Sequence, residues 1–489
     1  MFEAVELGRS TTKEDFKSQE PVFRVGLLTV QYELRDADFP VIILLAGNDG
    51  LGCTELSNVL SEWMDPRYIE THVFDSASEE EKERPRFWRY WRALPRRGTI
   101  GLYLREWTAR AVVDRALGKT DDVALDKRLR HIESFERELT DDGALLLKFW
   151  LHMPKKALNR RVRRAEKSPG RAWRVSRVDR EVCKHYEAIS SVAASVIRRT
   201  ETGVAPWNII ESTDSRYRDQ TAAQVIIQTL TKRLAEPPLA APKKGKHDVS
   251  SSPITVLDQV DLSRTLSKAS YEKKLGRQWR RLAKLSEKAH RKGVSLVIAF
   301  EGWDAAGKGG AIRRLTRSMD AAHVRVIPIA APTEEERGHH YLWRFWRHLP
   351  RAGHAAIFDR TWYGRVLVER VEGFAREREW KRAYAEINDF EEQLADHGVV
   401  VLKFWLHLSQ EEQLRRFKER EKVAFKKYKI TADDYRNRER WNEYELAADE
   451  MVQRTSTEYA PWHLIAGNDK RSARVEVLEI VRARLERAL

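Results

Sequence analysis

A short glycine-rich segment, GWDAAGK at residues 302–308, has the residue types and spacing of a phosphate-binding loop. Glycines such as Gly302 and Gly307 let successive backbone N–H groups face an anion, and Lys308 adds a full positive charge. Gly309 and Gly310 follow the lysine, so the hydroxyl that often ligates magnesium there is absent. The segment predicts a site for a phosphate group, with the metal held by other residues. The alternative is a tight turn with a surface lysine.

Two aspartates are spaced to hold that metal. Asp304 lies inside the loop, and Asp359 ends the apolar run AAIFD, about 50 residues further along the chain. Magnesium prefers hard carboxylate oxygens, supplemented by water and substrate phosphates. We therefore expect both side chains to ligate Mg²⁺, with Asp359 in the part of a Walker B aspartate. For Asp359, the alternative is a structural ion pair with a neighbouring arginine.

The chain repeats itself with an offset of 255 residues, so that position 302 corresponds to position 47. The first copy of the loop reads GNDGLGC, and Cys53 stands where the second copy has Lys308. Leu104 likewise stands in place of Asp359. The first copy therefore lacks both a cation and a carboxylate that phosphoryl transfer needs. We predict that the second half is active and that the first is catalytically inactive.

A strongly cationic stretch, RRFKEREK at residues 415–422, is followed by KKYK at residues 426–429. In a phosphate-transferring enzyme, such a segment would be a helical lid. Arg415 and Arg416 would close over the phosphates, exclude water and offset the developing negative charge. The alternative is a solvated helix face with ion pairs between residues four apart.

Two further motifs occur in both copies. The segment WRFWRHLP at residues 343–350 recurs as WRYWRALP at residues 88–95. It could present arginines to a polyanion, but its persistence in the decayed copy favours a helix that packs its aromatic side chains inside each domain. KFWLH, at residues 403–407 and 148–152, is most simply a buried strand.

Apolar runs in the second half predict the elements that position these residues. Runs at 295–300, 324–330, 355–358, 399–406 and 463–466 suggest parallel strands buried on both faces. Amphipathic stretches such as 308–319 and 376–396 suggest crossover helices. The predicted fold class is α/β, with two tandem P-loop kinase-like domains, each a parallel sheet flanked by helices with a helical lid. The candidate residues should meet beyond the carboxyl ends of the strands.

Composition limits the class of protein. The chain has 489 residues, enough for two domains, and a formal net charge of +15, which attracts polyanions in general. Two cysteines, no leader pattern and no apolar run near the ~18 residues of a membrane span predict a cytoplasmic location. Prolines and lysines at 236–253 predict a linker between a first domain at 1–235 and a second at 254–489.

The sequence EGWDAAGKGG at 301–310 and the sequence FDRTWYGR at 358–365 resemble the polyphosphate kinase 2 family. A duplicated chain with a degenerate first copy is similar to the family's fused two-domain subgroup. By this resemblance, Lys308 contacts the transferred phosphate, the two aspartates handle Mg²⁺ and the acceptor phosphate, and Arg360 lies by the active site. The resemblance also places further residues in the phosphate or nucleotide site or the lid region: Tyr363, Arg365, Glu369, Arg415, Arg416 and Lys418.

The resemblance implies transfer of the terminal phosphoryl group of inorganic polyphosphate to AMP, giving ADP. Three alternatives stay open: ADP or GDP as acceptor or the reverse synthesis, an ATP-dependent nucleotide kinase, and a non-enzymatic polyanion-binding scaffold. Neither a nucleic acid nor a membrane is expected as a partner, and a homo-oligomer is left open.

Overall fold

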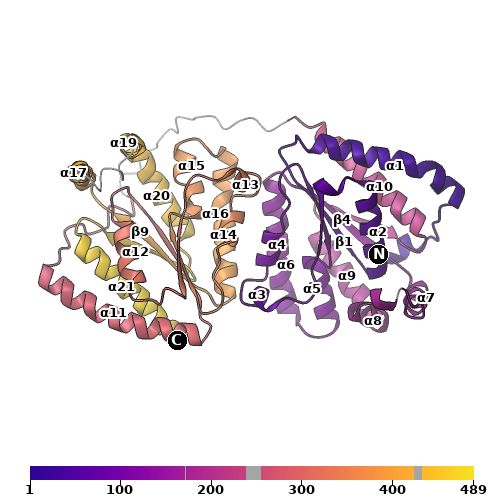
Figure 1. Cartoon of the computed structure of the whole chain (residues 1–489), viewed down its shortest axis with the longest axis horizontal. Helices are drawn as coiled ribbons and strands as arrows, with labels where there is room; N and C mark the ends of the chain where they lie inside the picture. The colour runs from indigo at the N-terminus through magenta and orange to yellow at the C-terminus, as the bar shows by residue number, and fades with distance from the viewer. Residues whose placement is uncertain (171, 238–254, 423–431) are drawn as a thin grey trace. The chain divides into compact units, whose positions relative to one another are not determined.

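The computed structural model describes residues 1–170, 172–237, 255–422 and 432–489 (Figure 1). These residues form two compact units. Unit 1 consists of Met1–Ala77, Ala93–Leu239 and Glu334–His340, and unit 2 of Ser78–Arg92, Ala240–Thr333 and Tyr341–Leu489. Each unit thus includes one short segment of the other repeat, which a contiguous division of the chain did not anticipate. Most of the predicted linker at 236–253 lies outside the described residues.

Unit 1 is built on a parallel sheet of five strands in the order β2-β3-β1-β4-β5. The central strands are buried along their whole length because helices cover both faces of the sheet. The strands are β1 (Val41–Gly47), β2 (Ile69–Val73), β3 (Ile100–Leu104), β4 (Leu145–His152) and β5 (Trp207–Glu211).

The helices of unit 1 pack in two groups, α1 with α2 and α10, and α5 with α6 and α9. Their bounds are α1 (Lys13–Leu34), α2 (Gly50–Trp63), α5 (Trp107–Ala116), α6 (Asp122–Asp141), α7 (Lys155–Glu166), α8 (Arg177–Lys184), α9 (Tyr186–Thr200) and α10 (Ser215–Leu234), and α13 (Glu334–Arg337) also belongs here.

Unit 2 repeats this architecture, with a parallel sheet in the order β7-β8-β6-β9-β10. All five strands expected in this half are confirmed, with ends that shift by a few residues: β6 (Leu296–Gly302), β7 (Val324–Pro328), β8 (Ala355–Asp359), β9 (Val400–His407) and β10 (Trp462–Ala466). The predicted fold class of two tandem α/β domains with parallel sheets is therefore confirmed.

The helices of unit 2 also pack in two groups, α11 with α12 and α21, and α16 with α15 and α20. Their bounds are α3 (Glu79–Lys82), α4 (Trp88–Arg92), α11 (Lys268–Arg291), α12 (Lys308–Thr316), α14 (Trp343–Trp346), α15 (Val368–Val371), α16 (Glu377–Asp396), α17 (Gln410–Glu421), α19 (Ala432–Glu439), α20 (Trp441–Thr455) and α21 (Lys470–Ala488).

The aromatic segments that recur in both repeats, at residues 88–95 and 343–350, are largely buried. Trp343, Phe345 and Trp346 of α14 are all buried, and the Trp346 ring stacks on Trp91 of α4 with centroids 5.7 Å apart, inside unit 2. The tryptophan rings therefore serve packing, as the simpler interpretation of the sequence predicted. That interpretation placed each segment inside its own repeat, whereas α4 of the first repeat packs within unit 2.

A buried ion pair joins the sheet of unit 2 to α16. The ammonium of Lys403 on β9 donates to Glu391 on α16 at 2.7 Å, and both side chains are fully buried. Trp362 and Tyr363 also donate to Glu391. Burial raises the pKa of Glu391 and lowers the pKa of Lys403, so each charge depends on the other.

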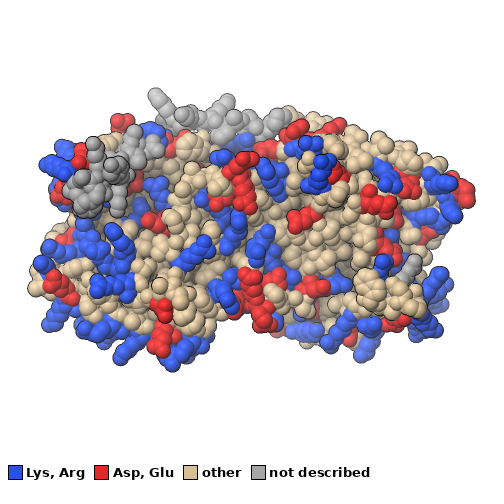
Figure 2. Space-filling model, in the orientation of Figure 1, with Lys and Arg blue, Asp and Glu red and all other residues tan. Residues whose placement is uncertain are grey.

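None of the helices in the described ranges combines the length and apolarity that a membrane crossing needs. On the face drawn in Figure 2, Lys and Arg side chains gather over α11, and acidic side chains are interspersed elsewhere.

We predict that Lys403→Met destabilises unit 2 by about 3 kcal/mol or more, because it leaves a buried carboxylate without its cation. The measurement is the urea unfolding transition of the full chain, followed by circular dichroism. Lys381→Met, which removes an exposed pair with Glu377, is the matched control and should cost little. The double variant Lys403→Met/Glu391→Gln should recover part of the loss; a single variant as stable as the control would contradict the interpretation.

Candidate functional site

The loop after β6 has the backbone of an anion cradle. Gly302 and Gly307 have φ values of 136° and 113°, and Ala305, which is not a glycine, also has a positive φ of 64°. A Cβ at Gly302 would lie 2.4 Å from the Leu406 carbonyl oxygen, so only glycine fits beside β9. Gly307 caps α12, whose first N–H groups therefore point out of the helix end.

Lys308 is the first residue of α12, and its ammonium folds back toward the loop. It donates to the carbonyl oxygen of Gly302 at 2.5 Å and lies 3.3 Å from that of Trp303. The cation therefore lies within the curve of the loop rather than in solvent. Gly309 and Gly310 add no side chain, and a Cβ at Gly310 would lie 3.2 Å from Nη2 of Arg474.

Asp304 is held from two sides. One carboxylate oxygen accepts from Arg360 at 3.2 Å, and the other accepts from Asn437 at 3.2 Å. Arg360 has a positive φ of 66°, which turns the chain sharply after β8. The structure thus brings together Asp304 and Arg360, two residues that the sequence singled out separately.

Asp359 is the last residue of β8 and lies in register with Phe300 of β6. Its backbone carbonyl accepts from Ile329, whereas its carboxylate has no hydrogen-bond or ion-pair partner within the described part of the chain. The structural ion pair considered as an alternative is therefore not seen among those residues. Asp359 and the loop lie at the same carboxyl edge of the sheet, as parallel strands require.

A third carboxylate was missed by the sequence reasoning. Glu301 precedes the loop, is buried, and accepts from Thr361 at 2.7 Å. Burial raises its pKa, and Lys308 and the Thr361 hydrogen bond oppose that rise. Its position at the end of an apolar strand was the available signal, because a charged residue there needs a partner.

The segment after β8 divides into interior and rim residues. Tyr363 is fully buried, and its hydroxyl is engaged by Glu391 and by Lys403. This placement supports a positioning role rather than contact with a substrate. Arg365 pairs with Glu369 at 3.1 Å beside Gly364, which lines the pocket.

Arg416 differs most from expectation. It is 1% exposed, and its guanidinium donates to the carbonyl oxygens of Ala305 and Ala306 in the loop and of Gly467 and Asn468 after β10, at 2.6–3.1 Å. It therefore fixes the loop and has no donor left for a substrate.

The other expected lid cations lie on the same helix. Arg415 is exposed and pairs with Glu412 and Glu419, which matches the solvated-face alternative. Lys418 lies on α17 as well. The KKYK sequence at 426–429 is outside the described residues.

The pocket at this edge has an aromatic wall that the sequence did not reveal. Trp303 stacks on Trp441 with centroids 3.6 Å apart and donates to His407 at 3.1 Å. Burial lowers the pKa of His407 to about 4, so this ring accepts as a neutral imidazole. Other lining residues that were missed are Leu367, Val368, Trp405, Gln413, Asn437 and Tyr444.

The equivalent loop of unit 1 has lost its cradle. Helix α2 begins at Gly50, the counterpart of Ala305, three positions earlier than α12. Asp49 caps α2 by accepting from Gly52 at 3.0 Å. Cys53 is buried, and burial raises the pKa of its thiol, so this position stays neutral.

Charged side chains of unit 1 fill the space around the lost cradle. Glu55 stands where unit 2 has Gly310, and it accepts from Arg161 at 2.6 Å and from Arg218 at 3.1 Å. Asp49 pairs with Arg161 at 3.2 Å, and Asp219, the counterpart of Arg474, pairs with Arg218 at 2.7 Å. These internal pairs occupy the cations that an anion would otherwise attract.

The architecture and this loop define a phosphate-transfer class of protein, and a family model identifies the class. The model described as Polyphosphate kinase 2 matches residues 10–238 and 265–489. These two ranges make up most of the chain, so the chain belongs to the polyphosphate kinase 2 family and contains two copies of its domain.

Particular relatives match the chain from end to end. It is 45% identical over 496 residues to the polyphosphate:AMP phosphotransferase of Pseudomonas aeruginosa, covering 100% of this chain and 99% of that protein. It is 36% identical to the enzyme of the same name from Acinetobacter johnsonii, over 96% of each. A crystal structure of a polyphosphate kinase 2 from P. aeruginosa superposes with a TM-score of 0.90 at 44% identity, covering 100% and 99% of the two chains.

We predict that Arg416→Lys lowers kcat by at least about tenfold, because a single ammonium cannot hold four carbonyl oxygens and the loop loses its geometry. The measurement is kcat from steady-state kinetics at a fixed magnesium concentration and saturating substrates. Arg161→Lys, at the equivalent position of unit 1, is the matched control and should leave kcat near that of the parent. Equal losses in both variants would contradict the assignment.

Proposed function

We propose that the chain transfers the terminal phosphoryl group of inorganic polyphosphate to AMP and releases ADP. The observation that carries this proposal is that only the second repeat combines Lys308, Asp304 and Asp359, whereas the first keeps Asp49 but has Cys53 and Leu104. The chain matches two polyphosphate:AMP phosphotransferases over 100% and 96% of its length. The first repeat is then catalytically inactive, since Cys53 and Leu104 supply neither charge.

The residues of the site fit a magnesium ion. Asp304 and Asp359 offer hard carboxylate oxygens, and the Asp359 carboxylate has no competing partner in the described ranges. Glu301 lines the same pocket as Asp304. When bound, Mg²⁺ would neutralise phosphate charge and orient the phosphate oxygens. Asp304 and Asp359 are its proposed ligands.

The chain's own residues would act mainly by position and charge. Backbone N–H groups at the start of α12 and the ammonium of Lys308 would bind the phosphoryl group in transit. Arg360, which Asp304 holds at 3.2 Å, would stabilise a neighbouring phosphate. An oxygen of the AMP phosphate would attack in line, the bond to the polyphosphate leaving oxygen would break, and no covalent protein intermediate is needed.

The roles of the remaining site residues follow from their placement. Arg416 would position the loop, and Tyr363 would support β9 through Lys403. Arg365 and Glu369 would shape the rim together, and Arg415 and Lys418 would attract polyphosphate from α17. A cytoplasmic location is part of the proposal.

Other acceptors give testable alternatives. ADP or GDP in place of AMP, or the reverse synthesis of polyphosphate, would use the same loop. An ATP-dependent nucleotide kinase would also need such a loop, and a scaffold would need only the net charge of +15. Incubation with AMP, Mg²⁺ and polyphosphate, without ATP, should give ADP; no product there but product with ATP would favour the kinase. ADP and GDP tested in parallel identify the preferred acceptor.

We predict that Lys308→Ala lowers kcat by roughly a hundredfold or more, because it removes the cation that faces the transferring group. Formation of ADP from AMP and polyphosphate is the assay. Cys53→Ala changes the equivalent position of unit 1 and should leave turnover unchanged. Comparable losses in the two variants would refute the division into an active and an inactive repeat, and no loss in either would favour the scaffold.

A further inference from the structure

Three histidines meet at the edge of the unit 2 sheet opposite the phosphate loop. His290 lies in the last turn of α11, and His323 and His354 immediately precede β7 and β8. One ring nitrogen from each lies within 4.8 Å of the other two. The rings of His290 and His323 stack with centroids 3.5 Å apart, and the His354 ring stands across both. All three are partly exposed, so an ion can reach them from solvent.

Two of these histidines are oriented as metal ligands are. Nδ1 of His290 lies 3.2 Å from the carbonyl oxygen of Gly353, and Nδ1 of His354 lies 3.0 Å from that of Ala352. A carbonyl oxygen only accepts, so each Nδ1 carries a proton, and in the neutral form of each ring Nε2 is the nitrogen available to a metal. In metal sites, a backbone carbonyl that accepts from the other ring nitrogen commonly fixes the orientation of the histidine.

The turn at residues 351–353, which precedes His354, fixes the two carbonyl groups of Ala352 and Gly353. Gly353 has a φ of 74°, and a Cβ there would lie 2.5 Å from the carbonyl oxygen of His290. Ser295 accepts from the Gly353 N–H and donates to the Arg351 carbonyl. The loop is therefore built before any ion arrives.

The first repeat keeps the same backbone arrangement, a glycine with positive φ beside a carbonyl oxygen at the helix end, without the histidines. Gly98, the counterpart of Gly353, has a φ of 81°, and a Cβ there would lie 2.8 Å from the carbonyl oxygen of Arg35. The three histidine positions hold Arg35, Tyr68 and Thr99, and the Arg35 guanidinium lies over the Tyr68 ring at 4.7 Å. The fold thus does not need histidine at these positions.

We propose that His290, His323 and His354 bind a borderline transition-metal ion such as Zn²⁺ through their imidazole nitrogens. Imidazole suits Zn²⁺, Co²⁺ and Ni²⁺ better than Mg²⁺, which prefers oxygen. Tetrahedral binding at 2.0–2.1 Å brings ligand nitrogens to about 3.4 Å from one another, and the three nitrogens already lie within 4.8 Å. The His323 ring must also turn out of its stack on His290 so that its lone pair faces the ion. His323 supplies this movement, because its ring has no hydrogen bond within the described residues, and water completes the coordination.

The test is a titration of the tag-free full chain with Co²⁺ and then Zn²⁺ in excess Mg²⁺, which occupies carboxylate sites. We expect one Co²⁺ per chain with visible absorption bands, displacement of those bands by Zn²⁺, and a rise in Tm with Zn²⁺. His323→Asn should weaken binding at least tenfold, whereas His185→Asn, a histidine of unit 1, should not.

A second variant separates binding from folding. His290→Arg/His323→Tyr/His354→Thr installs the residues that the same backbone arrangement accepts in the first repeat. It should lose the Co²⁺ bands and the Zn²⁺-dependent rise in Tm, while its circular dichroism and Mg²⁺-supported turnover stay those of the parent. The proposal is overturned if the parent chain takes up no Co²⁺, or if this variant binds as tightly as the parent.

A different observation concerns α7, the unit 1 counterpart of the lid helix α17. Helix α7 carries six basic residues and one acid, whereas α17 carries four of each. Arg161 is turned inward and pairs with Glu55. Five other cations line an open hollow along this helix and the residue that follows it: Lys156, Arg160, Arg163, Arg164 and Lys167.

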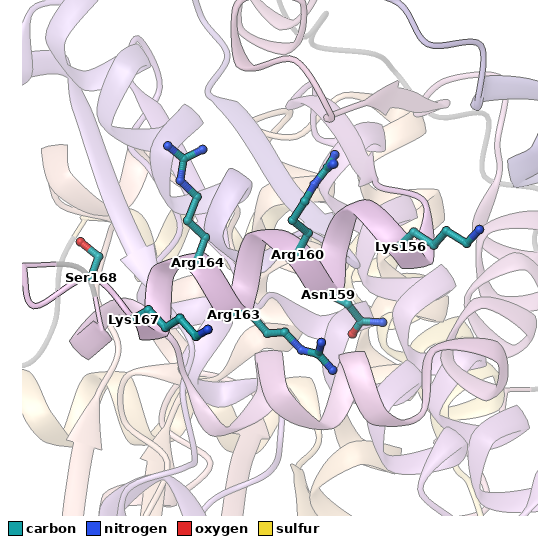
Figure 3. Close-up of a pocket in the computed structure, with 7 residues that line it drawn as sticks. All are labelled: Lys156, Asn159, Arg160, Arg163, Arg164, Lys167 and Ser168. Carbon is teal, nitrogen blue, oxygen red and sulfur yellow. The ribbon is translucent and has the colours of Figure 1, made fainter.

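Figure 3 shows how these side chains spread. Arg160 and Arg164 extend to one side of α7, and Arg163 and Lys167 extend to the other. None of the five has an ion pair with a carboxylate of the described residues, whereas Arg415 on α17 has two. The decayed repeat thus presents more uncompensated positive charge on this helix than the active one does.

We infer that α7 is a docking surface for long polyphosphate chains, which deepens the function proposed above and rests on it. A linear polymer with about one negative charge per phosphate can contact several cations at once, and a second contact raises its effective concentration. This subsite would act on chain-length preference and would take no part in the transfer step.

The test uses Arg160→Gln/Arg164→Gln, with Lys273→Gln/Arg277→Gln on α11 as a control of equal charge. We expect KM for long-chain polyphosphate to rise several-fold in the α7 variant only, with kcat and KM for tripolyphosphate and AMP unchanged. An unchanged KM, or an equal rise in the control, overturns the subsite.

Direct binding separates this subsite from the proposed function. Labelled long-chain polyphosphate should bind the Lys308→Ala chain, and the α7 changes should weaken that binding at low salt. If the parent makes no ADP yet this loss is seen, the function fails and the surface stands. If single-stranded RNA binds the chain as tightly as polyphosphate does, and the α7 changes weaken RNA binding by the same factor, the assignment to polyphosphate is overturned.

Discussion

The contact on which the candidate active site depends is made by one buried guanidinium. Arg416 gathers carbonyl oxygens from the phosphate loop and from the turn after β10, and Glu412 balances its charge. A loop that presents its N–H groups to an anion must turn carbonyl oxygens the other way, and buried carbonyls need donors. Arg416 supplies those donors. The positive φ of Ala305 and the left-handed Gly307 are stable because the outer side of the loop is held in this way.

The first repeat shows the arrangement that forms when the loop carbonyls no longer need buried donors. In unit 1, α2 starts earlier and its own amides are satisfied within the helix and by Asp49, so no anion is needed. The counterpart of Arg416, Arg161, then turns from backbone carbonyls to carboxylates. The sheet is unaffected, because its apolar runs and the pair of Lys148 with Glu136 are retained. The residues that build the sheet and those that build the phosphate loop are thus separate sets in this chain, and the first repeat keeps the first set without the second.

Sequence patterns predicted the strands well because each central strand is buried on both faces and reads as a continuous apolar run. They also predicted the loop, since glycines and a lysine at fixed spacing have few other uses. They did not predict the partners of Arg416. A cation on a helix with few apolar neighbours indicates a solvent-exposed side chain, but in the folded chain four carbonyl oxygens surround the Arg416 guanidinium. Tyr363 was assigned to the site for its neighbours in the motif, but its side chain points into the core. Glu301 and Trp441 act through contacts that only the folded chain creates.

The charge network of unit 1 also limits which single substitutions its interior accepts. Glu55, Arg161, Arg218 and Asp219 neutralise one another across three helices. Arg218 and Asp219 are buried, so replacing either one alone would leave its buried partner without an opposite charge. Restoring a lysine at position 53 would add another unbalanced charge among them. An anion-binding loop like that of unit 2 could therefore form in the first repeat only if several of these charged residues changed together.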